Sequence, residues 1–193
     1  MTGRIRRAQA TPGKQNQVRK RWRYAVRLNE ELARKISRAI CQFAKEQGCE
    51  VLVFEYLDMQ GKIRGSRKQK RHLWRKRGIQ KRCEHLAHRM GMRFARVNAR
   101  GTSAYAFDGS GKVTRDRDNY SMCTFTSGKR YHCDLSASYN IGARYWIREI
   151  LKSLPVTEGS LLEAEVPSVK RRSRCVYEDF LLLNKAMRSK GMR

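Results

Sequence analysis

The sequence lacks any long hydrophobic run. Its purely apolar segments have three or four residues, as in 51–54 and 181–183. A transmembrane helix needs about 20 such residues, so a membrane-spanning protein is excluded. The basic N-terminus, MTGRIRRAQATPGK, is not followed by an apolar segment, which excludes a cleaved secretory signal.

Acidic residues are scarce as well. The 193 residues include 44 Lys and Arg but 17 Asp and Glu, which gives a formal net charge of +27. Residues 1–27 hold nine basic residues and residues 62–82 hold eleven, and neither segment holds an acid. These runs are either solvated, flexible stretches or a surface that follows the phosphates of a nucleic acid. We favour the second interpretation because Trp74 stands among the arginines.

Two further patterns are missing. An anionic membrane surface would select a basic helix with Trp, Phe and Leu on its other face, and we find no segment of that kind. The six cysteines, at 41, 49, 83, 123, 133 and 175, have no compact spacing. Without an export signal we expect reduced thiols rather than a disulfide framework.

Periodicity predicts the order helix, strand, helix, strand in the middle of the chain. A helix over 28–46, ended by Gly48, has one apolar stripe that we expect to be buried: Leu28, Leu32, Ile36, Ala39, Ile40 and Phe43. The run VLVF at 51–54 is typical of a strand covered on both faces. A second helix over about 68–90 and a strand over 93–98 follow. We therefore expect an α/β fold with a βαβ-like unit and a parallel strand pair.

The rest of the chain predicts an insertion, a helix and a tail. Glycines and polar clusters after residue 100 indicate turns and short strands, which together make a small β-knuckle. A helix then begins near Asp134 and ends before Pro155. The predicted organisation is a basic arm (1–27), an α/β domain (28–154) with the knuckle inserted at 104–132, and a basic C-terminal tail with a short helix (155–193).

Two carboxylates occupy positions that suit a metal site. Glu55 follows a buried strand, at the edge where open α/β sheets bind ligands, and Asp134 begins a helix. Mg²⁺ and Mn²⁺ prefer such oxygen ligands and activate water for phosphodiester hydrolysis. The alternatives stay open: Glu55 as a solvent-facing charge at a strand end, and Asp134 with Ser136 as a helix cap.

The chain resembles the C-terminal part of the TnpB-like transposon-encoded RNA-guided endonucleases, which are related to type V CRISPR effectors. The resemblance covers about residues 20–150, in the order VLVFEYLDM, the Lys/Arg-rich helix, GMRFARVNARGTSAYAFDGSG and CDLSASYNIGARYW, and DLSASYNIGAR is its most specific piece. It implies a partial RNase H-like (RuvC-type) domain with an inserted, degenerate zinc-ribbon-like β-knuckle. It also implies Mg²⁺- or Mn²⁺-dependent DNA cleavage, in which Glu55 and Asp134 resemble the second and third acids of a catalytic Asp–Glu–Asp trio.

The resemblance and the basic runs together imply partners and contact residues. We expect DNA and guide RNA as partners, the missing N-terminal half of the same protein as another, and no membrane. The expected location is the cytoplasm of a bacterium or archaeon, near the nucleoid. The predicted nucleic-acid contacts are Arg67, Lys68, Lys70, Arg71, Trp74, Arg75, Lys76 and Arg144.

The sequence departs from the family in two places that matter. No Asp precedes Asp58, so the first acid of the trio is absent and we expect this chain alone to be inactive. Family members usually carry a zinc ribbon built from two CxxC pairs. Here Ala106 and Gly109 stand at the first pair, and only Cys123 remains near the second, with His132 and Cys133 close by. We therefore expect no zinc.

Two functions of different classes follow. The chain is either the C-terminal portion of a transposon-associated DNA endonuclease, supplying two of three metal-binding carboxylates, or a catalytically inactive remnant or regulator that binds guide RNA or transposon DNA. A ribosomal-protein-like RNA binder also fits the composition, but it leaves Glu55 and DLSASYNIGAR unexplained.

Overall fold

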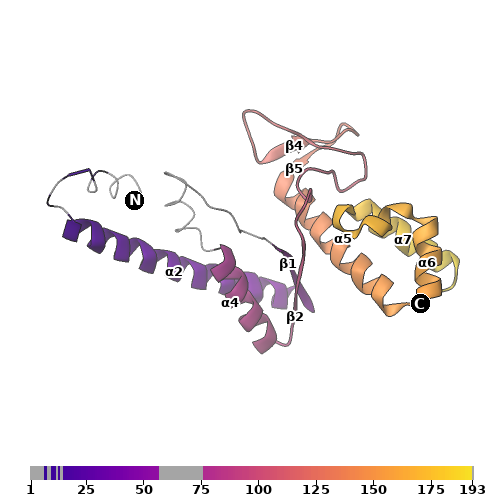
Figure 1. Ribbon diagram of the computed structural model, residues 1–193, viewed down its shortest axis with the longest axis horizontal. Helices are drawn as coiled ribbons and strands as arrows, with labels where there is room; N and C mark the ends of the chain where they lie inside the picture. The colour runs from indigo at the N-terminus through magenta and orange to yellow at the C-terminus, as the bar shows by residue number, and fades with distance from the viewer. Residues whose placement is uncertain (1–6, 8–9, 12, 14, 57–75, 193) are drawn as a thin grey trace. The chain divides into compact units, whose positions relative to one another are not determined.

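The computed structural model describes residues 7, 10–11, 13, 15–56 and 76–192 (Figure 1). The chain forms two compact units, of which unit 1 comprises 1–52 and 58–94 and unit 2 comprises 53–57 and 95–193. The fold is a mixture of helices and small sheets, which confirms the α/β class at this coarse level. None of the helices in the described ranges is both long and apolar enough to cross a membrane.

Unit 1 is built on two helices, α2 (Gln15–Glu46) and α4 (Lys76–Arg89). Both end where the sequence predicts, at glycines with positive φ: Gly48 at +67° and Gly91 at +76°. After α2, the N–H of Cys49 donates to the carbonyl of Ala44 at 2.9 Å. This bond spans the last turn, closing the helix in the manner that a left-handed glycine permits. α2 begins thirteen residues before the predicted start at Leu28, so half of the expected basic arm is helix.

The packed face of α2 differs from the predicted one. Leu28, Leu32, Ile36 and Phe43, expected to be buried, are 41%, 46%, 43% and 65% exposed. The buried residues are small instead: Ala33, Ser37, Cys41 and Ala44. They meet Cys83 and Ala87 of α4, and the Ser37 hydroxyl donates to the carbonyl of Ile79 at 3.3 Å. Small side chains let the two helix axes approach closely.

The chain passes between the two units along two strands, which pair in a two-stranded sheet. Its strands are β1 (Val51–Tyr56) and β2 (Arg93–Asn98), and each begins in unit 1 and ends in unit 2. The N–H of Arg93 donates to the carbonyl of Glu50 at 2.8 Å. Because this bond joins the beginnings of both strands, the strands run in the same direction. The predicted order of helix, strand, helix and strand, with a parallel pair, is confirmed.

Unit 2 contains the β-knuckle. It is a three-stranded antiparallel sheet of β3 (Thr114–Arg115), β4 (Met122–Thr124) and β5 (Arg130–His132), with β4 in the centre. Cys123 pairs with Arg115 on one side and with Tyr131 on the other. Ala106, Cys123, Phe125 and Cys133 form the small core beneath it. The short strands expected between residues 104 and 132 are therefore present.

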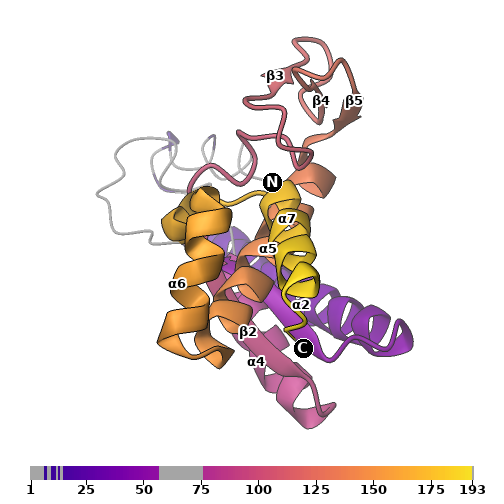
Figure 2. The ribbon, with the colours of Figure 1, turned by 90° about the vertical axis from the view of Figure 1, so that its right-hand side faces the viewer.

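The second part of unit 2 is helical (Figure 2). It comprises α5 (Cys133–Ser153), α6 (Val156–Glu165), the 3₁₀ helix η1 (Pro167–Arg174) and α7 (Tyr177–Ser189). Their shared core contains Ile147, Leu151, Leu162, Val166, Val169, Cys175, Leu183 and Ala186. The helix expected between Asp134 and Pro155 is confirmed. The segment after Pro155, expected to be a tail, is instead packed against that helix.

Candidate nucleic-acid interface and carboxylates

Both predicted carboxylates belong to unit 2. Glu55 is the fifth residue of β1 and is half-buried, whereas Asp134 is the second residue of α5 and is exposed. The structure thus places one acid near the end of a strand and the other at the start of a helix, as the sequence indicates.

His132, rather than Asp134, caps α5. Its Nδ1 accepts a hydrogen bond from the N–H of Asp134 at 3.2 Å. Asp134 therefore sits inside the first turn, where a carboxylate is stabilised by the partial positive charge of the helix start. Ser136, the other residue of the alternative cap, is buried, and its hydroxyl has no hydrogen-bond partner in the described part of the chain. The interpretation of Asp134 as the helix cap is therefore wrong, because His132 is the cap. The Asp134 carboxylate is exposed to solvent.

The carboxylates do not form a complete ligand set for metal ions. A two-metal phosphodiesterase site clamps both ions, normally through a shared ligand. Across residues 15–56 and 76–192, no three His, Cys, Asp or Glu side chains are grouped closely enough to hold a metal ion. The described residues alone therefore do not fit a two-metal site, and we derive no hydrolytic step from them.

Arg144, predicted to contact nucleic acid, lies inside unit 2 with 3% of its surface exposed. Its Nε donates to the carbonyl of Cys175 at 2.9 Å, and its Nη1 donates to the carbonyl of Asn98 at 2.6 Å. Burial lowers the pKa of its guanidinium below the usual range. In this arrangement the side chain ties α5 to the end of β2 and to the segment before α7, away from the solvent where a phosphate would lie.

Asn140, one turn earlier on α5, has a similar role that the sequence did not reveal. It is fully buried, and its Nδ2 donates to the carbonyls of Thr102 and Tyr105 at 3.0 and 2.9 Å. Its Oδ1 accepts from the N–H of Tyr177 at 3.0 Å. The polar residues in the most specific motif, DLSASYNIGAR, thus include two that hold unit 2 together.

The other predicted nucleic-acid contacts cannot be placed. Arg67, Lys68, Lys70, Arg71, Trp74 and Arg75 lie outside the described residues, and the side chain of Lys76 is likewise not described. Their assignment stays a prediction.

The positive charge is concentrated in unit 1. The sequence ranges of unit 1 contain 26 basic and 6 acidic residues, a net charge of +20. Those of unit 2 contain 18 basic and 11 acidic residues, a net charge of +7. A polyanion therefore meets its strongest attraction at unit 1, because phosphate neutralisation grows with the number of basic contacts.

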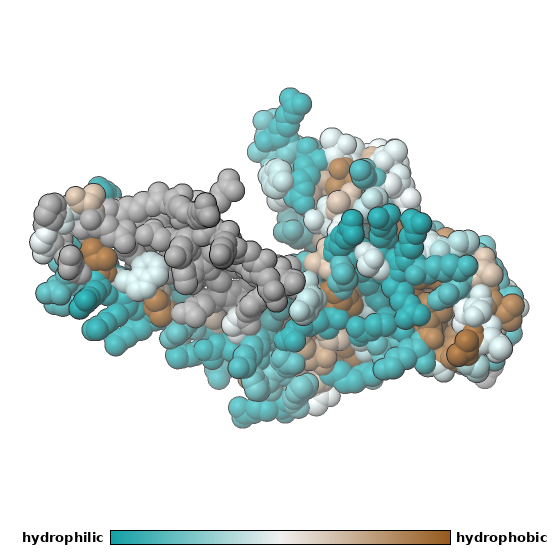
Figure 3. All heavy atoms as spheres, viewed as in Figure 1, coloured by the Kyte–Doolittle hydropathy of each residue, from teal (hydrophilic) through white to brown (hydrophobic). Residues whose placement is uncertain are grey.

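The face of α2 beside its packed seam carries a row of cations, which we call the α2 basic face. It consists of exposed residues three, four or seven apart, hence on one side of the helix: Lys20, Arg23, Arg27, Arg34, Arg38 and Lys45. From Lys20 to Lys45 it extends about 37 Å, at 1.5 Å per residue. Figure 3 shows hydrophilic side chains projecting along one edge of α2, with hydrophobic ones visible between them. The spacing of these cations is present in the sequence, where the apolar stripe of the same helix is the more conspicuous pattern.

The knuckle holds two neighbouring thiols rather than an open cluster of ligands. Cys123 and Cys133 are 1% and 2% exposed. The Cys123 thiol contacts the carbonyl of Tyr131 at 3.4 Å. Burial, with a contribution from Cys133, raises the pKa of the Cys123 thiol to about 11. The Cys123 thiol is therefore protonated at neutral pH, and both cysteines belong to the small core beneath the knuckle.

Comparison with known proteins does not add to these observations: the chain matches no protein-family model and no curated protein.

Proposed function

We propose that this chain binds nucleic acid through unit 1, with the α2 basic face as the principal contact. The observation that carries the proposal is this row of six exposed cations on one side of a single helix, interrupted at Glu31 and at Gln42. A partner that satisfies so many charges over about 37 Å is itself a linear polyanion. The resemblance to the C-terminal part of TnpB-like endonucleases supports the same partner, as DNA or guide RNA.

The arginine content favours nucleic acid over an anionic membrane. Unit 1 contains 17 Arg among its 26 basic residues. The planar guanidinium binds phosphate through two parallel hydrogen bonds, which suits backbone recognition better than a lysine point charge does. A membrane remains the rival because the exposed stripe of Leu28, Leu32 and Ile36 lies on the same helix. The test therefore includes vesicles.

The experiment measures binding of fluorescently labelled single-stranded DNA, single-stranded RNA and duplex DNA by anisotropy. We expect the double variant Arg23→Ala/Arg27→Ala to bind roughly tenfold or more weakly than the wild type, because two phosphate contacts are lost. The matched control, Lys152→Ala/Arg188→Ala, removes two exposed charges from unit 2 and is expected to change the affinity less than about twofold. Tighter binding to anionic vesicles than to every oligonucleotide would contradict the proposal.

A second candidate function is metal-dependent DNA cleavage. It rests on the placement of Glu55 near the end of β1 and Asp134 in the first turn of α5 within one unit. In this case unit 2 is part of an RNase H-like (RuvC-type) domain with a zinc-ribbon-like knuckle, and the two carboxylates bind Mg²⁺ or Mn²⁺ together with an acid from another segment. We expect no cleavage by this chain alone.

Supplying a third acid tests this second function. The chain joined to an N-terminal segment that carries the first Asp should cleave DNA in Mg²⁺, and Glu55→Gln should abolish the cleavage. Glu158→Gln, on α6, serves as the matched control. If Glu55→Gln cleaves at the rate of the control, the assignment is wrong.

A further inference from the structure

A concentrated group of basic side chains lies in unit 2, on the 3₁₀ helix η1. Four of the five residues from 170 to 174 are basic and exposed, and we call them the η1 basic cluster: Lys170, Arg171, Arg172 and Arg174. No other stretch of five residues in the sequence of unit 2 contains more than two basic residues. The cluster is therefore the strongest local concentration of positive charge in this unit.

The backbone of the cluster is held by the core of unit 2. Val169, just before it, and Cys175, just after it, are 0% and 1% exposed and belong to the helical core. The Cys175 thiol donates to the carbonyls of Ser168 at 3.6 Å and Arg171 at 3.7 Å. A run of basic residues is usually a flexible, solvated stretch, but this segment is fixed at both ends. Less conformational entropy is therefore lost when a ligand binds to it.

Acidic side chains of unit 2 neutralise one of the four cations. The Nη2 atom of Arg172 lies 3.7 Å from a carboxylate oxygen of Glu163. Glu165, which is close to η1 in the sequence, pairs instead with Lys190 at 3.1 Å. Within the part of the chain that the structure describes, the other three side chains take part in no hydrogen bond or ion pair: Lys170, Arg171 and Arg174. These three charges are available to an external anion.

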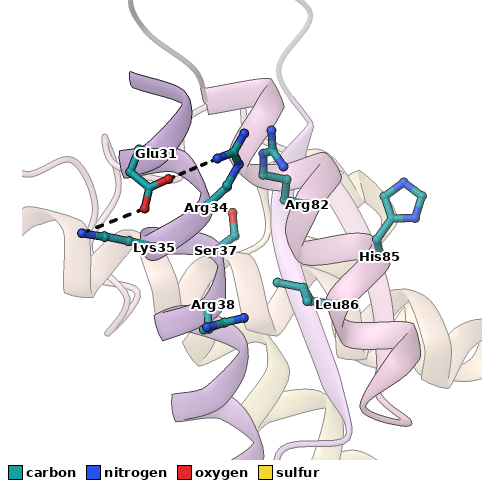
Figure 4. Close-up of a pocket in the computed structure, with 8 residues that line it drawn as sticks. All are labelled: Glu31, Arg34, Lys35, Ser37, Arg38, Arg82, His85 and Leu86. Atoms are coloured by element: carbon teal, nitrogen blue, oxygen red, sulfur yellow. Dashed lines mark hydrogen bonds and ion pairs between the residues drawn. The ribbon is translucent and has the colours of Figure 1, made fainter. Parts of the chain in front are cut away.

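The cleft between α2 and α4 in unit 1 differs in this respect (Figure 4). It has a volume of about 520 Å³, and basic residues contribute to both of its sides. Two of them, Arg34 and Lys35, pair with Glu31 at 3.1 Å and 4.0 Å. Figure 4 shows the guanidiniums of Arg38 and Arg82 at separate places. The cleft therefore adds no anion site to the α2 basic face.

The arrangement of the three free cations suits a polyanion better than a small anion. Lys170 and Arg174 are four peptide units apart, so at most about 14 Å separates their Cα atoms. One strand of a DNA duplex carries a phosphate for about every 3.4 Å of axis, so several phosphates fall within that length. A single inorganic phosphate offers one. Each cation can therefore contact a phosphate of its own on a nucleic-acid backbone.

The same segment lacks what an anionic membrane would require. Binding to a bilayer surface needs apolar side chains that enter the boundary between headgroups and acyl chains. Between residues 168 and 174 the one apolar side chain is Val169, and it is fully buried. The segment offers contacts to phosphate groups and nothing to insert into a bilayer.

We propose that the η1 basic cluster is a second binding site for a nucleic-acid backbone, in which Lys170, Arg171 and Arg174 each neutralise a separate phosphate. The inference rests on the proposed function and goes beyond it. The proposed function assigns nucleic-acid binding to unit 1, whereas this site belongs to unit 2 and is formed by residues of a different segment.

The test measures the affinity of the full chain for labelled single-stranded DNA and RNA over a series of salt concentrations. The triple variant Lys170→Ala/Arg171→Ala/Arg174→Ala should bind at least tenfold more weakly. Its slope of log affinity against log salt should be lower by about 2, because each single-strand phosphate contributes about 0.7. Arg171→Lys/Arg174→Lys keeps the charge but loses the planar fork, so the slope should stay and the affinity should be intermediate.

The matched control is Arg117→Ala/Lys152→Ala/Arg188→Ala. It removes the same residue types from unit 2, and its three residues are exposed but far apart in the sequence. We expect its affinity to stay within about threefold of the wild type and its slope to change by less than about 0.7. Both triple variants change exposed side chains, so their thermal unfolding should match that of the wild type.

The outcomes separate failure of this site from failure of the proposed function. If the η1 triple variant binds like its matched control while Arg23→Ala/Arg27→Ala binds weakly, the η1 site is wrong although the chain binds nucleic acid. If the wild type binds neither DNA nor RNA, both are wrong. Tighter binding to anionic vesicles or to polyglutamate than to either oligonucleotide, lost in the η1 triple variant, would show a different partner and overturn the proposal.

Discussion

Replacing Asn140 by Ala should destabilise unit 2 more than any exposed substitution. The side chain makes three hydrogen bonds to backbone groups of Thr102, Tyr105 and Tyr177 at 2.9–3.0 Å, and it is fully buried. Each such bond contributes about 1 kcal/mol net, so the variant should lose about 3 kcal/mol of unfolding free energy. The loss is larger if the three freed backbone groups stay away from water.

The loss should be visible as a lower melting temperature. For a chain of 193 residues, about 3 kcal/mol corresponds to a decrease of about 6–12 °C. Unit 2 is followed by the fluorescence of Trp146, which lies on α5, after Trp22 and Trp74 are replaced by Phe. This single-tryptophan protein reports on unit 2 even if unit 1 unfolds separately.

Two further variants make the result specific. Asn140→Asp keeps the volume and the acceptor for Tyr177, but it places an acceptor against the carbonyls of Thr102 and Tyr105, so it should also be destabilised. Asn184→Ala, half-buried on α7, should change the unfolding free energy by less than about 0.5 kcal/mol. A melting temperature for Asn140→Ala equal to that of Asn184→Ala would refute the role assigned to this residue.

Three other predictions follow from the thiols, the glycines and the helical core. Cys49 is the one exposed cysteine among six free cysteines, so iodoacetamide at pH 8 should label it first. Burial raises the pKa of the Cys83 thiol to about 11, so Cys83 should react only after unfolding. Mass spectrometry of the labelled peptides checks this order. Gly142 is helical, and an added Cβ there would have open space within 4 Å, so Gly142→Ala should stabilise the protein by about 0.5–1 kcal/mol in urea unfolding. Gly48 has a φ of +67°, so Gly48→Ala should destabilise the protein by about 1 kcal/mol in the same assay. Leu162→Ala should cost about 2–5 kcal/mol in the same assay, because the segment after Pro155 is core rather than tail; an unchanged midpoint would contradict that packing.

Local sequence signals predict where the helices and strands lie better than they predict which face of a helix is buried. The glycines at 48 and 91 mark helix ends because only a left-handed residue closes the last turn there, and this requirement is local. The packed face of α2 was predicted wrongly for a physical reason. Leu28, Leu32 and Ile36 have the spacing of a buried stripe, but α4 approaches closely only over small residues such as Ser37 and Cys41.

The parts of the site that depend on distant residues were not predictable. Arg144 and Asn140 bond to carbonyls 31 to 46 residues away, and no sequence spacing encodes such partners. The region after Pro155 has only short apolar groups, so its packing against α5 emerges from the fold rather than from periodicity. The cleft between α2 and α4 likewise brings together lining residues from two helices, such as Ser37 and Leu86, that no sequence spacing relates.

The measurement that tests the central claim most directly is the salt dependence of single-strand binding by the wild type and by the triple variant Lys20→Ala/Arg23→Ala/Arg27→Ala. Each single-strand phosphate contact contributes about 0.7 to the slope of log affinity against log salt. If the α2 basic face is the principal contact, the triple variant should bind more weakly and its slope should be lower by about 2. Binding by the wild type with the same affinity and slope as the triple variant would show that nucleic acid, if bound, does not lie along α2.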